Sequence, residues 1–191
     1  MKRHLVQGVG INDCKRSATV CINGKRKITK EYATWHSMLV RCYNEKYQSK
    51  FISYKNCKVC EEWLTFSNFK AWMEKQDWEG KELDKDLLGY GKLYSPDTCC
   101  FLTKKQNYFL TYRSVAYLFG AKRHSTCDRY EVSVQDSTGT YKSYVGLFKT
   151  EADAHEAWRK RKWEIAQILF AGCESRIMEA INEKYGNKEF N

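Results

Sequence analysis

The stretch Leu83–Arg113 restricts the folds open to this chain more than any other part of its sequence. An apolar run into Asp84 predicts the end of a short strand, and the segment Gly89–Gly91 predicts a turn. The apolar run Cys99–Leu102 predicts a second strand, and Thr103 is a suitable N-cap for the basic helix that follows. The order strand, turn, strand, helix predicts a β-hairpin packed on a helix.

Two polar side chains of this stretch could share one divalent ion. Asp84 ends the first predicted strand, and Asn107 lies on the predicted helix. A hairpin packed on a helix can bring two such positions together, so we expect the carboxylate and the amide to converge. Hard oxygen ligands of this kind suit Mg²⁺ or Mn²⁺.

These residues give the stretch a resemblance to the ββα-metal (HNH) nuclease motif. In that family an acid–histidine pair ends the first strand, an asparagine-type position opens the second, and an Asn or His on the helix completes the metal site. By this resemblance Asp84 and Asn107 are the first and last metal ligands. Lys85 stands where the family has its general-base histidine, and Thr98 fills the middle position.

A minority branch of the same superfamily, found among restriction enzymes, resembles this arrangement more closely. It has a basic residue after the aspartate and uses the tyrosine of a Tyr-Ser-Pro turn as the base. That comparison gives Tyr94 the base role, with Lys85 stabilising the phenolate or gripping the phosphate. The alternative is that loss of the histidine has left a DNA-binding protein without catalysis. The histidines of the chain all lie outside the motif, at His4, His36, His124 and His155.

The charge of the chain favours a polyanionic partner. Its 191 residues carry 33 basic and 23 acidic side chains, a formal net charge of +10. The simplest partner for such a surplus is a phosphate backbone, so we expect double-stranded DNA to bind, with RNA as a weaker alternative. With 42% hydrophobic and 15% aromatic residues the chain is expected to fold, and no apolar run predicts a membrane span.

The nine cysteines predict reduced thiols rather than disulfides. The number is odd and no signal peptide is recognisable, so the expected location is a cytosol. The resemblance implies that this is the cytosol of a phage-infected host cell. Cys57 and Cys60 form the only Cys-x-x-Cys pair. A closed zinc site needs four ligands, and the other cysteines lack that spacing, so we do not expect a structural zinc ion.

Residues 1–33 are expected to form a basic arm. Alternation in Ala18–Ile22, followed by Asn23-Gly24, predicts a short hairpin. The basic side chains that follow are candidate phosphate contacts, and a solvated edge is the alternative. These candidates are Lys25, Arg26 and Lys27.

Residues 34–114 are expected to form the nuclease domain. Trp35, Met38, Leu39 and Cys42 follow helical spacing, and Glu61–Glu74 repeats the pattern. The two predicted helices would cover one face of the hairpin-and-helix motif, which is too small to fold alone. The same residues are similar to a family of phage-borne HNH-type proteins, and that likeness covers most of residues 8–112.

Residues 115–191 are expected to form a second unit. The segment Phe119–Arg123 is predicted to begin a strand, further strands are predicted over Arg129–Val134 and Lys142–Phe148, and a turn is predicted at Ser137–Gly139. Thr150 is a predicted N-cap for a long helix, and a short terminal helix follows it. The predicted buried face of the long helix carries Ala154, Ala157, Trp158, Ile165, Ile168 and Leu169.

Three antiparallel strands backed by one helix resemble the ethylene-response-factor (ERF) type of DNA-binding domain. The matching segments are Phe119–Lys122, Arg129–Tyr130 and Tyr144–Phe148. In that family the sheet lies in the major groove, and such domains are also appended to phage and homing nucleases. The residues that the resemblance turns toward DNA are Lys122, Arg123, Arg129, Gln135, Lys142 and Tyr144.

The sequence and the two resemblances together predict an α+β protein. A ββα-metal nuclease core with supporting helices would be followed by a small three-stranded antiparallel sheet on one helix. The expected function is that of a metal-dependent DNA endonuclease of phage homing or restriction type, and the alternative is a catalytically inactive DNA-binding regulator. The target site, the choice between nicking and double-strand cleavage, and the oligomeric state, a homodimer included, stay open.

Overall fold

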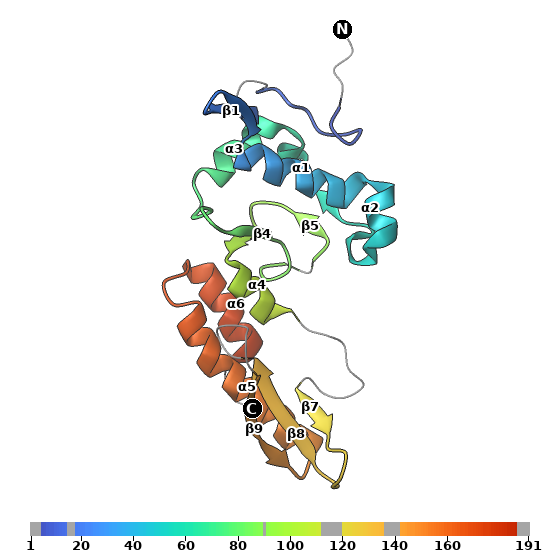
Figure 1. Ribbon diagram of the computed structural model, residues 1–191, viewed down its shortest axis with the longest axis vertical. Helices are drawn as coiled ribbons and strands as arrows, with labels where there is room; N and C mark the ends of the chain where they lie inside the picture. Colours follow the sequence, from blue (N-terminus) through green and yellow to red (C-terminus); the bar gives the residue numbers. More distant parts are fainter. Residues whose placement is uncertain (1–4, 15–17, 90, 112–119, 136–141, 187–191) are drawn as a thin grey trace. The chain divides into compact units, whose positions relative to one another are not determined.

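The computed structural model describes residues 5–14, 18–89, 91–111, 120–135 and 142–186 (Figure 1). It combines helices with several small sheets, as expected for an α+β protein. The chain forms two compact units, Met1–Phe101 and Leu102–Asn191, each of which is described by itself. The turn predicted at Ser137–Gly139, together with Tyr90 and Phe119, lies outside the described residues. No helix in the described ranges combines the length and the apolar character needed to cross a bilayer.

The first unit is built from short elements. Its helices are α1 (Lys30–Tyr43), α2 (Glu45–Lys50) and α3 (Phe66–Met73), with the 3-10 turns η2 (Ile52–Tyr54) and η3 (Glu61–Leu64). Its strands are β1 (Thr19–Ile22), β2 (Lys25–Ile28), β3 (Lys58–Val59), β4 (Glu82–Asp84), β5 (Leu93–Tyr94) and β6 (Cys100–Leu102), the last of which ends at the boundary between the units. They pair as β1 with β2, β3 with β5, and β4 with β6.

Helix α1 supplies the central packing surface of the first unit. It begins at Lys30, four residues before the predicted start, because the Thr29 side chain accepts a hydrogen bond from Tyr32 N and caps it. The predicted apolar stripe is confirmed as buried, and the Trp35 indole donates to Trp63 O at 2.7 Å. Each fully buried side chain of this size contributes about 1.5–3 kcal/mol by leaving water.

The single helix predicted over Glu61–Glu74 is divided in two. Ile11 forms backbone hydrogen bonds on either side of the point where the predicted helix is interrupted. Ile11 N donates to Leu64 O at 2.8 Å, and Phe66 N donates to Ile11 O at 3.0 Å. A backbone N–H that is bonded to another segment cannot continue the helical ladder, so η3 ends and α3 starts anew at Phe66. Ile11 and its neighbours Val6 and Val9 therefore pack against this unit.

The second unit packs three helices and one sheet. Its elements are α4 (Lys104–Leu110), β7 (Ala121–Arg123), β8 (Tyr130–Gln135), β9 (Lys142–Phe148), α5 (Glu151–Leu169) and α6 (Ser175–Tyr185). The strands form an antiparallel sheet in the order β7-β8-β9, and α5 lies against it (Figure 1). Ala121, Val132 and Val134 are the buried residues of β7 and β8, and they define the face of the sheet toward α5.

The buried face of α5 differs from the prediction at three positions, one of which is Ala166, fully buried and not predicted there. Ile168 is 75% exposed, which corrects its predicted place in the core, and Lys162 is buried instead. The Lys162 ammonium donates to Phe109 O on α4 at 2.6 Å, and burial lowers the pKa of this lysine to about 7. An isolated apolar stripe on a helix cannot reveal that a lysine will reach a carbonyl of another helix.

Helix α4 belongs to the second unit because its side chains pack there. Gln106 Nε2 donates to Leu169 O at 3.0 Å, and the Phe109 ring contacts Phe170 and Tyr185. The observed boundary therefore follows Phe101 rather than the predicted position between residues 114 and 115. The predicted cap of this helix is confirmed: Thr103 and Gln106 form a capping box with reciprocal side-chain bonds to the backbone.

Gly120 lies at a closely packed position of the second unit, against Trp158. Its φ is +84°, and a Cβ added there would overlap the Trp158 ring. Gly172 has a similar φ of +78° but open space around it. We expect Gly120→Ala to lower the free energy of unfolding by about 2–4 kcal/mol and Gly172→Ala by about 1–2 kcal/mol, since only the first adds a steric clash to the left-handed backbone penalty. Urea unfolding of both variants measures the difference, and equal losses would contradict the close approach of Gly120 to Trp158.

Candidate functional site

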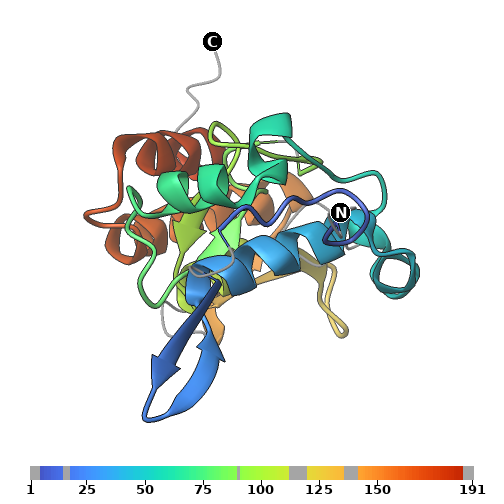
Figure 2. The same ribbon diagram turned by 90° about the horizontal axis from the view of Figure 1, so that it is seen from above.

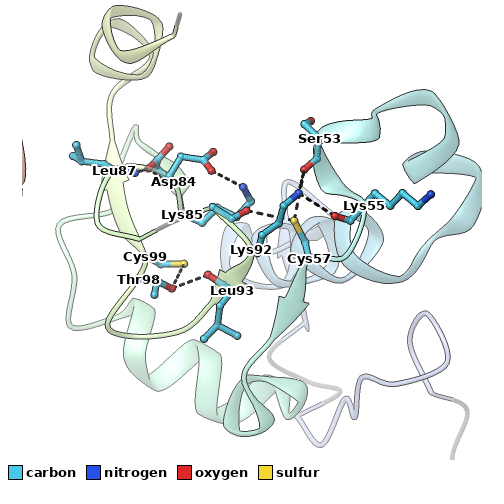
Figure 3. Close-up of polar contacts among 12 residues, drawn as sticks. Ser53, Lys55, Cys57, Asp84, Lys85, Leu87, Lys92, Leu93, Thr98 and Cys99 are labelled. Atoms are coloured by element: carbon cyan, nitrogen blue, oxygen red, sulfur yellow. Dashed lines mark hydrogen bonds and ion pairs between the residues drawn. The ribbon is translucent and has the colours of Figure 1, made fainter. Parts of the chain in front are cut away.

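Asp84 ends β4, as predicted, and its carboxylate organises the turn that follows. Oδ2 accepts hydrogen bonds from Asp86 N and Leu87 N, both at 2.8 Å (Figure 3). Burial raises the pKa of Asp84 above its ordinary value, while these two bonds act in the opposite direction. Because the turn uses Oδ2, Oδ1 is the oxygen that could bind a cation.

Lys85 is turned into the protein. It is 5% exposed, and its ammonium lies 2.7 Å from Asp86 Oδ1. The same ammonium lies 5.5 Å from the centre of the Tyr54 ring and 5.8 Å from that of the Tyr94 ring. In this arrangement Lys85 balances Asp86 and stands beside the predicted base, a position that suits stabilising a phenolate better than reaching a phosphate in solvent.

Gly91 makes room for this ion pair. Its φ is +74°, and a Cβ there would lie 2.6 Å from Asp86 Oδ1 and 3.8 Å from the Lys85 ammonium. Only glycine combines that backbone conformation with that approach. The predicted glycine turn thus has a packing role as well as a conformational one.

Tyr94 is a core residue rather than an exposed turn residue. It lies on β5, is 1% exposed and packs among the buried side chains of the first unit. Burial raises its pKa well above the ordinary value, although a side-chain hydrogen bond to Arg41 favours the phenolate. The Arg41 guanidinium also lies 5.6 Å from the centre of the Tyr54 ring. Sequence reasoning missed Arg41, because its position on α1 carries no signal of proximity to Tyr94.

Thr98, at the middle position of the motif, closes the turn after Tyr94. Its hydroxyl donates to Leu93 O at 2.7 Å (Figure 3). The same hydroxyl accepts from Ser95 N at 3.1 Å. Cys99 N donates to Ser95 O at 3.0 Å, which continues the chain into β6. Thr98 therefore shapes the backbone in this structure, and its hydroxyl is engaged by that turn.

A segment from outside the motif holds the same turn. Lys92 Nζ donates to Ser53 O and Lys55 O at 3.0 Å each (Figure 3), and the parallel β3–β5 pair adds backbone bonds. Cys57 Sγ lies 3.5 Å from Gly91 O, so this buried cysteine packs against the turn. All nine cysteines are free thiols. Within the described ranges no group of three or more His, Cys, Asp or Glu side chains could hold a metal ion.

Asn107 lies on α4, as predicted, in the second unit. Its backbone N–H donates to Thr103 O at 2.9 Å, and its carbonyl accepts from the Thr111 hydroxyl. The side chain is partly exposed. Asp84 belongs to the first unit, so the two predicted ligands lie in different units of the chain.

The outer face of the β7-β8-β9 sheet carries most of the residues predicted to face DNA. Val132 and Val134 point to α5, so the alternate residues of β8, among them Gln135, point away from it. The strand register adds Lys122, opposite Glu131, and the pairs Ser133–Tyr144 and Gln135–Lys142 to that outer face. Tyr144 is 62% exposed.

Arg123 and Arg129 differ from this set. Arg123 lies opposite Tyr130, on the same side of β7 as buried Ala121, and it forms an ion pair with Asp128. Arg129 is exposed in the turn that precedes β8. The sheet face therefore brings Lys122, Gln135, Lys142 and Tyr144 together, whereas the two arginines lie at its edge.

A polar pocket on α1 is a candidate anion site that the sequence did not suggest. Its volume is about 250 Å³, and it is bounded by one face of α1 and by residues 81–83 at the start of β4. Three cationic side chains and two hydroxyls contribute to it, together with one carboxylate. These polar residues are Lys30, Thr34, Ser37, Arg41, Lys81 and Glu82.

Comparison with known proteins adds no assignment to this geometry. No protein-family model matches the chain, and neither the curated proteins nor the solved structures yield a match.

Proposed function

We propose that this chain is a metal-dependent DNA endonuclease of the ββα-metal type, with a second unit that binds DNA through its sheet. The observation that supports this proposal best is the order of elements around the candidate residues. β4 ends at Asp84 and pairs with β6, and Thr103 then caps the helix that carries Asn107. The net charge of +10 supports a nucleic-acid substrate.

The donor atoms of the two candidate ligands fit a hard divalent cation. Asp84 offers carboxylate Oδ1, since Oδ2 is used by the turn, and Asn107 offers an amide oxygen. Mg²⁺ commonly uses only one or two protein ligands and keeps waters on its other positions. When bound, such an ion would neutralise the charge that develops on the phosphate and on the leaving oxygen.

The protein would contribute the base and its electrostatic support. Tyr94 would accept the proton of the attacking water as a phenolate, which Arg41 would stabilise by hydrogen bonding and Lys85 by its nearby charge. Because Tyr94 is 1% exposed, the turn around it must shift before water reaches the hydroxyl. The sheet face of the second unit would hold the duplex through Lys122, Lys142 and Tyr144.

A catalytically inactive DNA-binding regulator is the second candidate, and burial of the base favours it. Tyr94 packs in the core with a raised pKa, and the Lys85 ammonium is paired with Asp86. Both side chains then have structural roles that need no reaction.

Incubation of the purified protein with supercoiled plasmid distinguishes the two candidates. We expect nicked or linear product with Mg²⁺ or Mn²⁺ and none with EDTA, because the proposed reaction needs a cation to neutralise the leaving oxygen. Host genomic DNA serves as a second substrate that offers more sites. Gel shifts without cuts, on both substrates and with both metals, would favour the regulator.

A further inference from the structure

The β1–β2 hairpin is a ribbon whose tip and both faces are exposed. All residues from Val20 to Ile28 are exposed, and the hairpin extends from the start of α1 (Figure 2). It is held at its base, where Ala18 is buried and Thr29 N donates to Ala18 O at 3.0 Å. An isolated two-stranded ribbon is marginally stable in water, so covering one face would stabilise it.

The strand register assigns the side chains to two different faces. The pairs Val20–Lys27 and Ile22–Lys25 share one face, on which all four side chains are exposed. The pairs Thr19–Ile28 and Cys21–Arg26 share the other, on which Thr19 is partly buried. The first face therefore presents two β-branched apolar side chains, 42% and 43% exposed, beside two lysines.

The charge of this face limits what can cover it. Val20 and Ile22 favour an occupant with apolar groups, while Lys25 and Lys27 require that occupant to be anionic. A second copy of the ribbon would bring like charges together, and lysines on a strand edge oppose such pairing. The major groove of B-form DNA meets both requirements: it admits a two-stranded ribbon, and it displays thymine methyl groups between two phosphate backbones.

The pocket on α1 continues the same surface. Thr29 caps α1 directly after β2, so the ribbon passes into the pocket-lining helix without a linker. Lys30 is the first residue of α1, and the pocket also offers the Ser37 hydroxyl, whereas the Thr34 hydroxyl donates to Lys30 O. Lys30 and the Ser37 hydroxyl, with Lys81 (which also pairs with Asp77), border a space of about 250 Å³ that suits one phosphate group beside the groove.

We infer that the β1–β2 ribbon inserts its Val20, Ile22, Lys25 and Lys27 face into the major groove of duplex DNA, with the α1 pocket binding an adjacent backbone phosphate. The inference rests on the proposed function only in that DNA is the substrate. It adds a base-contacting element to the first unit, separate from the sheet of the second.

Fluorescence anisotropy with the full chain and a labelled random-sequence DNA duplex, in EDTA so that no cleavage occurs, tests the inference. The Lys25→Gln, Lys27→Gln pair should lower the slope of log affinity against log salt by about 1.8, at ~0.9 per phosphate contact, and weaken binding roughly tenfold near physiological salt. The control pair Lys46→Gln, Lys50→Gln removes the same charge from exposed positions on α2 and should change the slope little.

A second variant separates groove insertion from simple charge attraction. Val20→Ser with Ile22→Ser should weaken binding several-fold and leave the salt slope unchanged, because it removes apolar contacts and no charge. Equal weakening by the ribbon and control lysine pairs would overturn the inference. So would equally tight binding of an RNA duplex, because the A-form major groove is too narrow for a ribbon. If the unmodified chain binds no DNA, the proposed function itself fails, which is a different result from binding that ignores the ribbon.

Discussion

Asp84→Asn should abolish metal-dependent cleavage and leave the fold and DNA affinity nearly unchanged. The substitution removes the negative charge that would hold the cation, and loss of that cation should reduce the rate by at least about a thousandfold. The asparagine side-chain oxygen can still accept from Asp86 N and Leu87 N, so the turn after β4 is kept. Asp84→Ala loses both the charge and the turn, so comparison of the two variants separates catalysis from stability.

Asn107→Ala should have the same effect on cleavage, because it removes the second proposed ligand. Asp97→Asn is the matched control for Asp84→Asn, since Asp97 is an exposed acid in the turn between β5 and β6. Plasmid cleavage measures activity, thermal melting measures stability, and anisotropy in EDTA measures DNA affinity. Full cleavage by purified Asp84→Asn and Asn107→Ala proteins would rule the metal site out.

Tyr94→Phe should slow cleavage by about 10²–10⁴-fold if the phenolate is the general base. The ring keeps its place in the core, and only the titrating oxygen is lost. The variant also removes the hydrogen bond to Arg41, which should cost about 1–3 kcal/mol of unfolding free energy because the guanidinium is left with fewer partners. Tyr54→Phe is the control, since that ring also contacts Arg41 and Lys85.

The pH dependence of the cleavage rate also tests whether Tyr94 is the general base. Burial raises the pKa of Tyr94, so the reactive phenolate is scarcer at every pH below that pKa than it would be in an exposed tyrosine. The rate should therefore rise about tenfold per pH unit and continue to rise past pH ~10, where an exposed tyrosine would level off. Rapid cleavage by Tyr94→Phe together with a slow Lys85→Met variant would move the base assignment to Lys85.

The sequence correctly predicted those elements that are determined by neighbouring residues. The Asn23-Gly24 turn predicted the β1–β2 hairpin, helical spacing predicted α1, and Thr103 predicted the start of α4. β3 and β5 were missed, because each has two residues and a period cannot be read from two. The division of Glu61–Glu74 was missed for a related reason: Ile11, which breaks the ladder, is remote in sequence.

At the candidate site, too, the sequence predicted local features but not contacts between distant residues. Sequence placed Asp84 at a strand end and Asn107 on a helix, because both positions follow from neighbouring residues. It did not place Tyr94 in the core or beside Arg41, since burial and proximity depend on distant parts of the chain. Whether the buried tyrosine acts as a base or as a packing residue is decided by the rate measurements above.

The parallel pairing of β3 with β5 also bears on the time at which the first unit folds. It joins residues about 35 positions apart, whereas the β1–β2 hairpin and α1 depend on near neighbours. Local hairpins and helices form within microseconds, while pairings that close long loops come later. The turn with Tyr94 is therefore expected to order last and to open first. The moment at which Tyr94 leaves solvent marks the completion of the unit.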